Sequence, residues 1–167
     1  MSQPVAVPAD GNLRVFYVQT IATPEFPQLA ELNAGTSKDV SCYITGEGFQ
    51  TTLEEQVTTD DRLCSRATFE QPGRWQKQMT LSYVYNMDDP TNNVMYLTLP
   101  YLTTGFIVAR WGVPYEQAWA DGDLVDVYPV KAGKPMKNAP TANSMLTVTQ
   151  KMFITGESID DALVGGS

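Results

Sequence analysis

The sequence contains no histidine and only two cysteines. Histidine is the commonest general base and the commonest metal ligand in proteins, so sites that depend on an imidazole are excluded. Cys42 and Cys64 are too few for a disulfide framework or a four-cysteine zinc site. We expect two buried thiols in a protein made in a reducing space, with a bridge between neighbouring strands as the alternative.

Charged residues are scarce, and bases are scarcer than acids. The charged fraction is 18%, below the ~25% typical of soluble domains. This shortage predicts a surface covered by Thr, Asn and Gln, or by partner subunits. The 11 basic and 19 acidic side chains give a formal net charge of −8. A fixed grip on duplex DNA needs a basic footprint and is therefore excluded, whereas a surface past which DNA moves without sticking is compatible with this charge.

Long hydrophobic runs are also absent. No apolar run approaches the ~20 residues that span a bilayer, and residues 1–11 lack the basic start and apolar core of a signal peptide. We therefore expect no membrane partner and a protein kept in an aqueous space, unless it leaves the cell as part of a larger particle. The length of 167 residues predicts a single domain over residues 1–167.

The most strand-like stretch of the chain is residues 104–133. Residues 106–111 form an almost unbroken apolar run, which predicts a strand covered on both faces. Residues 124–130 alternate and predict a second strand after an acidic turn. Further strands are predicted at residues 12–20, 39–45, 63–69, 77–87 and 145–154, a short helix at 90–99, and one or two helical turns at 28–32.

This pattern has six to eight strands, one short helix and no alternation of strands with helices. It predicts a mainly β fold, an antiparallel β-sandwich or barrel with a flanking helix. Residues 1–11 are predicted to be an extended N-terminal arm, and residues 157–167 a flexible C-terminal tail.

Residues 46–62 have a different composition from the strands around them. They hold five acids, one base and four threonines, with no stable apolar face. Polar segments of this length inside a compact domain are usually functional or mobile. Two interpretations stay open, a solvated loop or hairpin and a projecting loop that becomes ordered against another subunit.

No group of residues has the spacing of a catalytic, cofactor or metal site. Asp121, Asp123 and Asp126 resemble a fragment of a calcium loop but lack its glycine and distal glutamate at the required spacing. The adjacent acids at 54–55, 60–61 and 88–89 are predicted to be solvated charge or helix-start residues. We therefore expect no enzyme activity and no cofactor, with carboxylate chemistry as a remote rival.

Six segments resemble the major tail (tail tube) proteins of bacteriophages that have long non-contractile tails and infect actinobacteria. The resemblance covers about residues 12–156 and depends on the joint order of the segments. These are ELNAG at 31–35, FEQPGR at 69–74, YVYN at 83–86, ARWG at 109–112, DLVDVYPV at 123–130 and VTQK at 148–151.

The resemblance implies a β-sandwich or incomplete barrel whose copies form hexameric rings. Sheets of neighbouring copies join into one inner barrel, and stacked rings form a tube through which genomic DNA leaves the particle. The implied partners are further copies, the tape measure, tail terminator and baseplate proteins, and double-stranded DNA in transit. The implied location is the virion tail, after assembly in the host cytoplasm.

For ring-to-ring contacts we predict the loop at residues 46–62 together with the two arms, because long irregular segments that order on assembly keep a monomer soluble. Asp126 is predicted to be a lumen charge, since it interrupts an apolar strand; a paired charge or an inter-subunit contact is the alternative. Rival functions are another ring-forming component, such as a tail terminator or baseplate hub, and a monomeric β-barrel that binds a small ligand. The candidate contact residues are Glu47, Phe49, Leu53, Glu54, Glu55, Val57, Asp60 and Asp61.

Overall fold

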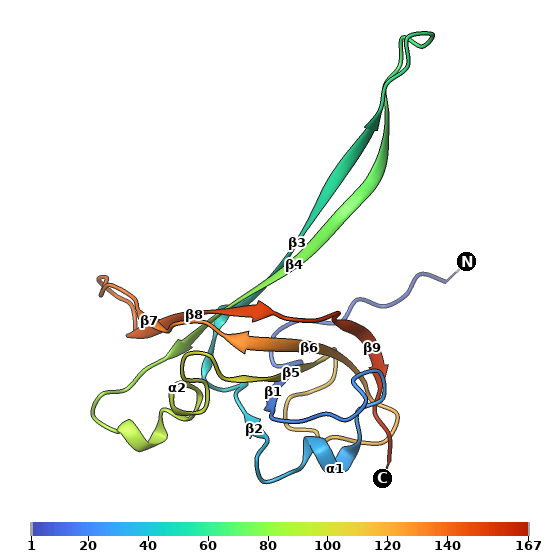
Figure 1. Cartoon of the computed structure of the whole chain (residues 1–167). Helices are drawn as coiled ribbons and strands as arrows, with labels where there is room; N and C mark the ends of the chain where they lie inside the picture. The colour runs from blue at the N-terminus through green and yellow to red at the C-terminus, as the bar shows by residue number, and fades with distance from the viewer. Residues whose placement is uncertain (1, 167) are drawn as a thin grey trace.

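The computed structural model describes residues 2–166 and has one open antiparallel sheet (Figure 1). Its strand order is β2-β1-β5-β6-β8-β4-β3, while β7 pairs with β8 and β9 with β6. The prediction of a mainly β, antiparallel fold with few helices is confirmed. The strands are β1 (Leu13–Val18), β2 (Lys38–Asp39), β3 (Ile44–Asp60), β4 (Phe69–Val84), β5 (Thr104–Trp111), β6 (Leu124–Ala132), β7 (Met136–Lys137), β8 (Thr147–Ile154) and β9 (Ile159–Leu163).

Two hydrophobic clusters lie on opposite faces of the central strands. Ile107 belongs to the first cluster and its neighbour Val108 to the second, because successive side chains of a strand point to opposite faces. The prediction that this run is covered on both faces is confirmed for residues 107–110, whereas Trp111 at its end is 50% exposed. The first cluster also contains Met79, Leu81, Tyr83, Met95, Leu99 and Met152, and the second contains Phe16, Leu32, Trp119, Val127, Ala162 and Val164.

The helices are short and cover the edges of these clusters. The predicted helix at 90–99 is present as a 3-10 turn (Pro90–Asn92) followed by α2 (Val94–Thr98), which buries Met95 in the first cluster. The predicted turns near residue 30 form α1 (Leu29–Leu32), which buries Leu32 in the second cluster. Among the helices in residues 2–166, none has the length and hydrophobicity to cross a membrane.

Two predicted strands differ from the observed ones. Residues 39–45 are not one strand, because β2 ends at Asp39 and a turn at residues 41–43 precedes β3. Residues 63–69 are not a strand either, since β4 begins only at Phe69 and the residues before it form the end of a hairpin. Residues 39–45 change partner at this turn, since Asp39 pairs with β1 and Ile44 with β4, whereas residues 63–68 belong to no strand pair of the described chain.

The C-terminal segment is a structured part of the sheet, unlike the flexible tail expected at residues 157–167. Strand β9 pairs with β6 in the register Val125↔Ala162, and both Ala162 and Val164 are buried. Backbone bonds continue to the end of the described chain, since the Gly165 N–H donates to Pro27 O at 2.8 Å. The acidic composition of this segment concealed its few inward-facing apolar residues. Position 167 lies outside the described residues.

The N-terminal arm and both cysteines lie at the surface of the molecule. Residues 2–8 have no regular secondary structure, and their side chains are exposed. Cys42 and Cys64 are both free and exposed, so the prediction of two buried thiols is wrong. Cys42 lies in the turn before β3 and Cys64 at the end of the hairpin, and both positions are at the surface of the molecule.

Candidate functional site

The most prominent feature of the molecule is a long hairpin formed by β3 and β4, which projects from the rest of the fold (Figure 1). The segment at residues 46–62 is therefore not a loop. Almost all of it belongs to the 17-residue strand β3, which pairs with β4 in registers such as Leu53↔Lys77 and Asp60↔Phe69. The threonines and Val57 favour this conformation because β-branched side chains fit a pleated strand.

An irregularity bends the hairpin halfway along its length. The register shifts between Glu55↔Trp75 and Val57↔Pro72, so β4 carries one more residue than β3 at this point. Gly73 lies in the bulge, where a Cβ atom would come within 2.9 Å of Gln56 O. Proline followed by glycine is typical of a turn, but in the structure Pro72 and Gly73 form the bulge inside β4.

The outer part of the hairpin has no partner within one copy. From residue 50 to 59 on β3 and from 69 to 76 on β4, every residue is exposed. Strand β3 pairs only with β4 in the described chain, and β8 begins to pair with β4 only at Met79. Two-stranded ribbons are marginally stable alone, and free strand edges readily pair with other chains.

The two faces of the hairpin differ in chemistry. One face carries Gln50, Thr52 and Glu54 opposite Thr80, Gln78 and Gln76, and it is polar with a single charge. The other face carries Leu53 opposite Lys77 and Glu55 opposite Trp75. The side chains of Leu53, Val57 and Trp75 are each more than half exposed. Exposed apolar side chains in this number indicate a contact surface rather than a solvated one.

The base of the hairpin is fixed to the remaining sheet. The Phe49 ring packs edge-to-face on the Trp111 ring, with centroids 5.7 Å apart. On the other strand, the Lys77 ammonium lies 3.2 Å from the Asp160 carboxylate in β9. The hairpin therefore has an anchored base and an exposed outer part.

The eight candidate contact residues all lie on this hairpin. Glu47 and Phe49 are at its base, where Glu47 is exposed and Phe49 packs on Trp111. Leu53, Glu54, Glu55 and Val57 are on the exposed ribbon. Asp60 lies near the end of the hairpin and pairs with Arg62 at 3.2 Å, and the exposed Asp61 follows it.

Sequence reasoning missed the β4 half of the same surface. Phe69, Trp75 and Leu63 are exposed apolar side chains of the hairpin, and none of them was a candidate. A useful signal was available, since Thr and Gln at alternate positions of residues 50–54 are matched by Gln and Thr at alternate positions of 76–80. The Pro72-Gly73 pair concealed that match because it divided β4 into two shorter segments.

Asp126, the predicted lumen charge, is held by its own chain. One carboxylate oxygen accepts a hydrogen bond from the Trp111 indole N–H at 2.8 Å, and the other accepts one from the Asp161 backbone N–H at 3.1 Å. Asp126 therefore joins β5, β6 and β9 at one end of the sheet. It also contributes, after burial, to raising the pKa of Tyr128 above its usual range.

The acidic turn that resembles a calcium loop has a different structural role. The Asp123 carboxylate accepts a hydrogen bond from the buried Arg110 guanidinium at 3.0 Å. Arg110 also donates to the backbone oxygens of Ala118 and Pro114, so it organises the connection between β5 and β6. Burial, with Arg110 nearby, lowers the pKa of Arg14. Among residues 2–166 no cluster of acids and cysteines is arranged to hold a metal ion.

Two comparisons with known proteins give matches. A family model described as "Phage tail tube protein" matches residues 1–167. A chain from a solved structure, "Cryo-EM structure of the anti-feeding prophage (AFP) baseplate, 6-fold symmetrised", has a similar fold, with a TM-score of 0.54 at 12% identity. The similarity covers 98% of this chain and 100% of that one. No curated protein sequence matches the chain.

The family match agrees with the resemblance noted in the sequence, and it spans the entire chain rather than one motif. Membership of a structural family implies a virion tail component with a non-enzymatic role. The chain therefore belongs to the phage tail tube protein family.

Proposed function

We propose that six copies of the chain form a ring and that stacked rings form the tail tube through which the genome leaves the particle. The observation that carries this proposal is the outer hairpin, whose faces and free edges are exposed in one copy. Pairing those edges with neighbouring copies satisfies the free backbone groups, and closing the ring removes the edges. The six-fold symmetry of the similar baseplate structure supports the number of copies.

The contacts between rings are assigned to the hairpin and to the arm at residues 2–11. Both are exposed in one copy, and the candidate residues from Glu47 to Asp61 lie along the hairpin. The tape measure, tail terminator and baseplate proteins are the proposed partners at the inside and the two ends of the tube. The resemblance in the sequence further suggests a long non-contractile tail of an actinobacterial phage.

The net charge of −8 supports a lumen that DNA passes without binding. Asp126 is the proposed lumen charge, and its half-buried side chain leaves it partly accessible. Asp126→Lys is expected to slow DNA release, measured only on particles with tails of normal length, because lysine also removes the acceptor of the Trp111 and Asp161 hydrogen bonds. Asp126→Asn removes the charge while its amide oxygen still accepts the Trp111 hydrogen bond, and it should slow release less than the lysine variant. Unchanged release from the lysine variant would contradict a role for this charge.

Electron microscopy of the concentrated purified protein tests the function directly. We expect hollow tubes built from rings of six copies. Their lumen should be wider than a DNA duplex, which is roughly 20 Å across. Single rings that do not stack would instead favour a tail terminator or a baseplate hub. A monomer at every concentration would contradict the proposal and favour the small-ligand alternative.

A further inference from the structure

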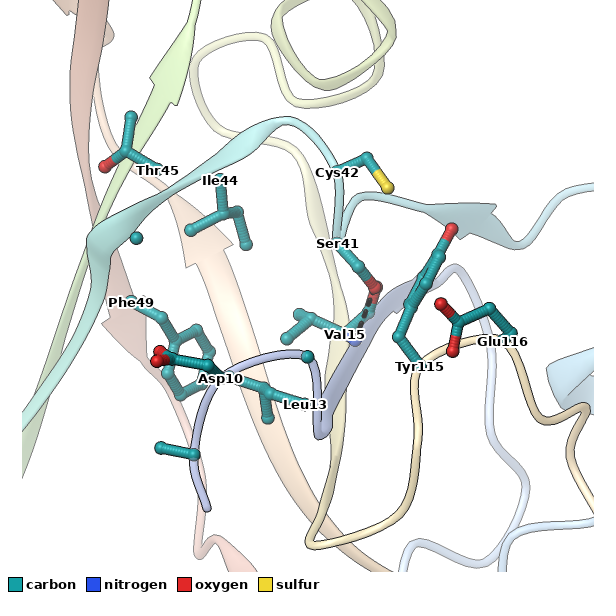
Figure 2. A pocket seen from close by; sticks show the side chains of 13 residues that line it. Asp10, Leu13, Val15, Ser41, Cys42, Ile44, Thr45, Phe49, Tyr115 and Glu116 are labelled. Carbon is teal, nitrogen blue, oxygen red and sulfur yellow. Dashed lines mark hydrogen bonds between the residues drawn. The ribbon is translucent and has the colours of Figure 1, made fainter.

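A hollow with an apolar floor lies at the base of the hairpin (Figure 2). It has a volume of about 330 Å³ and opens to the surface. Leu13 from β1 and Ile44 from the start of β3 line it and are each only half-buried, with the buried Val15 beneath them and the Phe49 ring beside them. Side chains of this kind remain partly in contact with water until another surface covers them.

The rim of this hollow is acidic. The exposed carboxylates of Asp10 and Glu116 belong to its lining, and among the described residues that line it there is no base. Tyr115, also in the lining, donates a hydrogen bond to a third carboxylate, that of Asp39, at 2.8 Å. A complementary ligand would therefore combine an apolar group with a positive charge.

The end of the hairpin has that combination. Leu63 is fully exposed, and Arg66 has no ion pair in the described chain, whereas Arg62 is already paired with Asp60. The turn is held by its own backbone, since the Ser65 N–H donates to Arg62 O at 3.1 Å. Leu63 is thus presented at a defined position, which lowers the entropy lost on binding.

One chain cannot bring these two surfaces together. The eleven steps of β3 from Phe49 to Asp60 extend roughly 37 Å at about 3.4 Å per residue, and the hollow lies at the start of that same strand. Consider a second copy that is displaced along the hairpin direction by about one hairpin length. The hollow of this second copy would lie at the hairpin tip of the first copy. Such a contact is head-to-tail and repeats without closing, as a filament requires.

We propose that the hairpin tip of one copy docks into the hollow of a copy in the next ring. In this contact Leu63 covers the floor formed by Leu13, Ile44 and Phe49, while Arg66 faces the acidic rim. The proposal rests on the proposed tube. It also limits the rise between rings to roughly 40 Å, because the hairpin cannot extend further at the strand spacing given above.

The two cysteines provide a direct test, because Cys42 lines the hollow and Cys64 follows Leu63 at the tip. Assembled wild-type tubes are treated with a short bismaleimide and analysed by denaturing electrophoresis. We expect a ladder of multimers, since each chain is linked through Cys42 to one neighbour and through Cys64 to another. Cys42→Ser and Cys64→Ser are each expected to abolish all cross-linking. Dimers that persist in the Cys42→Ser variant would contradict the contact.

Charge reversal gives a second, independent measurement. Arg66→Glu and Glu116→Arg are each expected to raise the protein concentration needed for tube formation, and the double variant is expected to restore it towards the wild-type value. Lys134→Glu is the matched control for Arg66→Glu, because it makes the same charge change at an exposed position outside both surfaces. Leu63→Asp is expected to abolish sedimentable tubes.

The outcomes separate this inference from the proposed function. If the wild-type protein forms no tubes, the proposed function itself fails. If it forms tubes and Leu63→Asp forms them equally well, or if their rise clearly exceeds roughly 40 Å, only the docking contact fails. A folded but non-assembling Leu63→Asp monomer, with a wild-type unfolding midpoint, supports the contact.

Discussion

The buried Arg110 guanidinium donates a hydrogen bond to the Asp123 carboxylate at 3.0 Å, and this ion pair closes the connection between β5 and β6. Arg110 is fully buried, whereas Asp123 is mostly buried. The two residues lie 13 positions apart in the chain, so the pair fixes a loop rather than a regular element. It accounts for the acidic turn without a metal.

Removing one member of this pair should destabilise the monomer strongly. Asp123→Ala leaves the Arg110 charge buried without its carboxylate, which typically costs about 3–5 kcal/mol. The measurement is the free energy of unfolding in urea. Asp121→Ala removes an exposed carboxylate from the same turn and should change that free energy by less than about 0.5 kcal/mol. Equal effects of the two substitutions would argue against the buried pair.

A second polar pair lies inside the first hydrophobic cluster. The Tyr83 hydroxyl donates to Gln150 Oε1 at 3.0 Å, and the Gln150 amide donates to Leu99 O and Gly133 O, each at 2.8 Å. Tyr83→Phe leaves the Gln150 oxygen without a donor and is expected to cost about 1–3 kcal/mol in unfolding free energy at roughly pH 8. Tyr101→Phe, at an exposed ring, is the control and should be nearly neutral.

The same hydroxyl predicts a pH dependence. Burial raises the pKa of Tyr83 above its usual range, so the folded protein favours the neutral phenol. The neutral Tyr83 hydroxyl contributes fully to the free energy of unfolding below the unfolded-state tyrosine pKa of about 10. This contribution declines as the pH rises beyond that value. The difference in unfolding free energy between wild type and Tyr83→Phe should therefore narrow above about pH 10. A difference that stays constant between roughly pH 8 and pH 11 would contradict the raised pKa.

Shortening the hairpin should separate folding from assembly. We replace residues 54–76 by Asn-Gly, a sequence that favours the two-residue turn needed between the paired Leu53 and Lys77. No member of either hydrophobic cluster lies in the removed segment, so the monomer should unfold cooperatively near the wild-type temperature. It should form no tubes by electron microscopy. Normal tubes would show that the outer hairpin is dispensable for assembly.

The C-terminal strand should be required for stability. Val164 is fully buried in the second cluster, and Val164→Ala is expected to lower the unfolding free energy by about 2 kcal/mol through lost burial and the cavity left behind. Leu163→Ala removes a neighbouring side chain that is 43% exposed and should have a smaller effect. A negligible effect of both substitutions, measured by urea unfolding, would indicate the flexible tail that the sequence suggested.

The sequence by itself determined the central sheet and the family. Strands β5, β6 and β8 lie close to their predicted positions, because their apolar residues recur at strand spacing and at least one face of each strand is buried within one copy. The family was identifiable because six short segments occur in the right order along the chain. Composition alone also excluded imidazole chemistry and a basic DNA grip, since both depend on residue types that are absent or scarce.

Only the tertiary structure decided the rest. The outer hairpin buries nothing within one copy, so its residues carry no hydrophobic period that marks them as strands. Strand β9 could not be predicted from its own residues, because it has few apolar side chains. It forms a strand because it pairs with the edge of β6, which is distant in the sequence. The exposure of Cys42 and Cys64 and the partners of Asp126 likewise depend on which distant segments meet. A local sequence pattern predicts a strand or helix when one face of that segment is buried. The features named here depend instead on contacts between segments that are far apart in the chain.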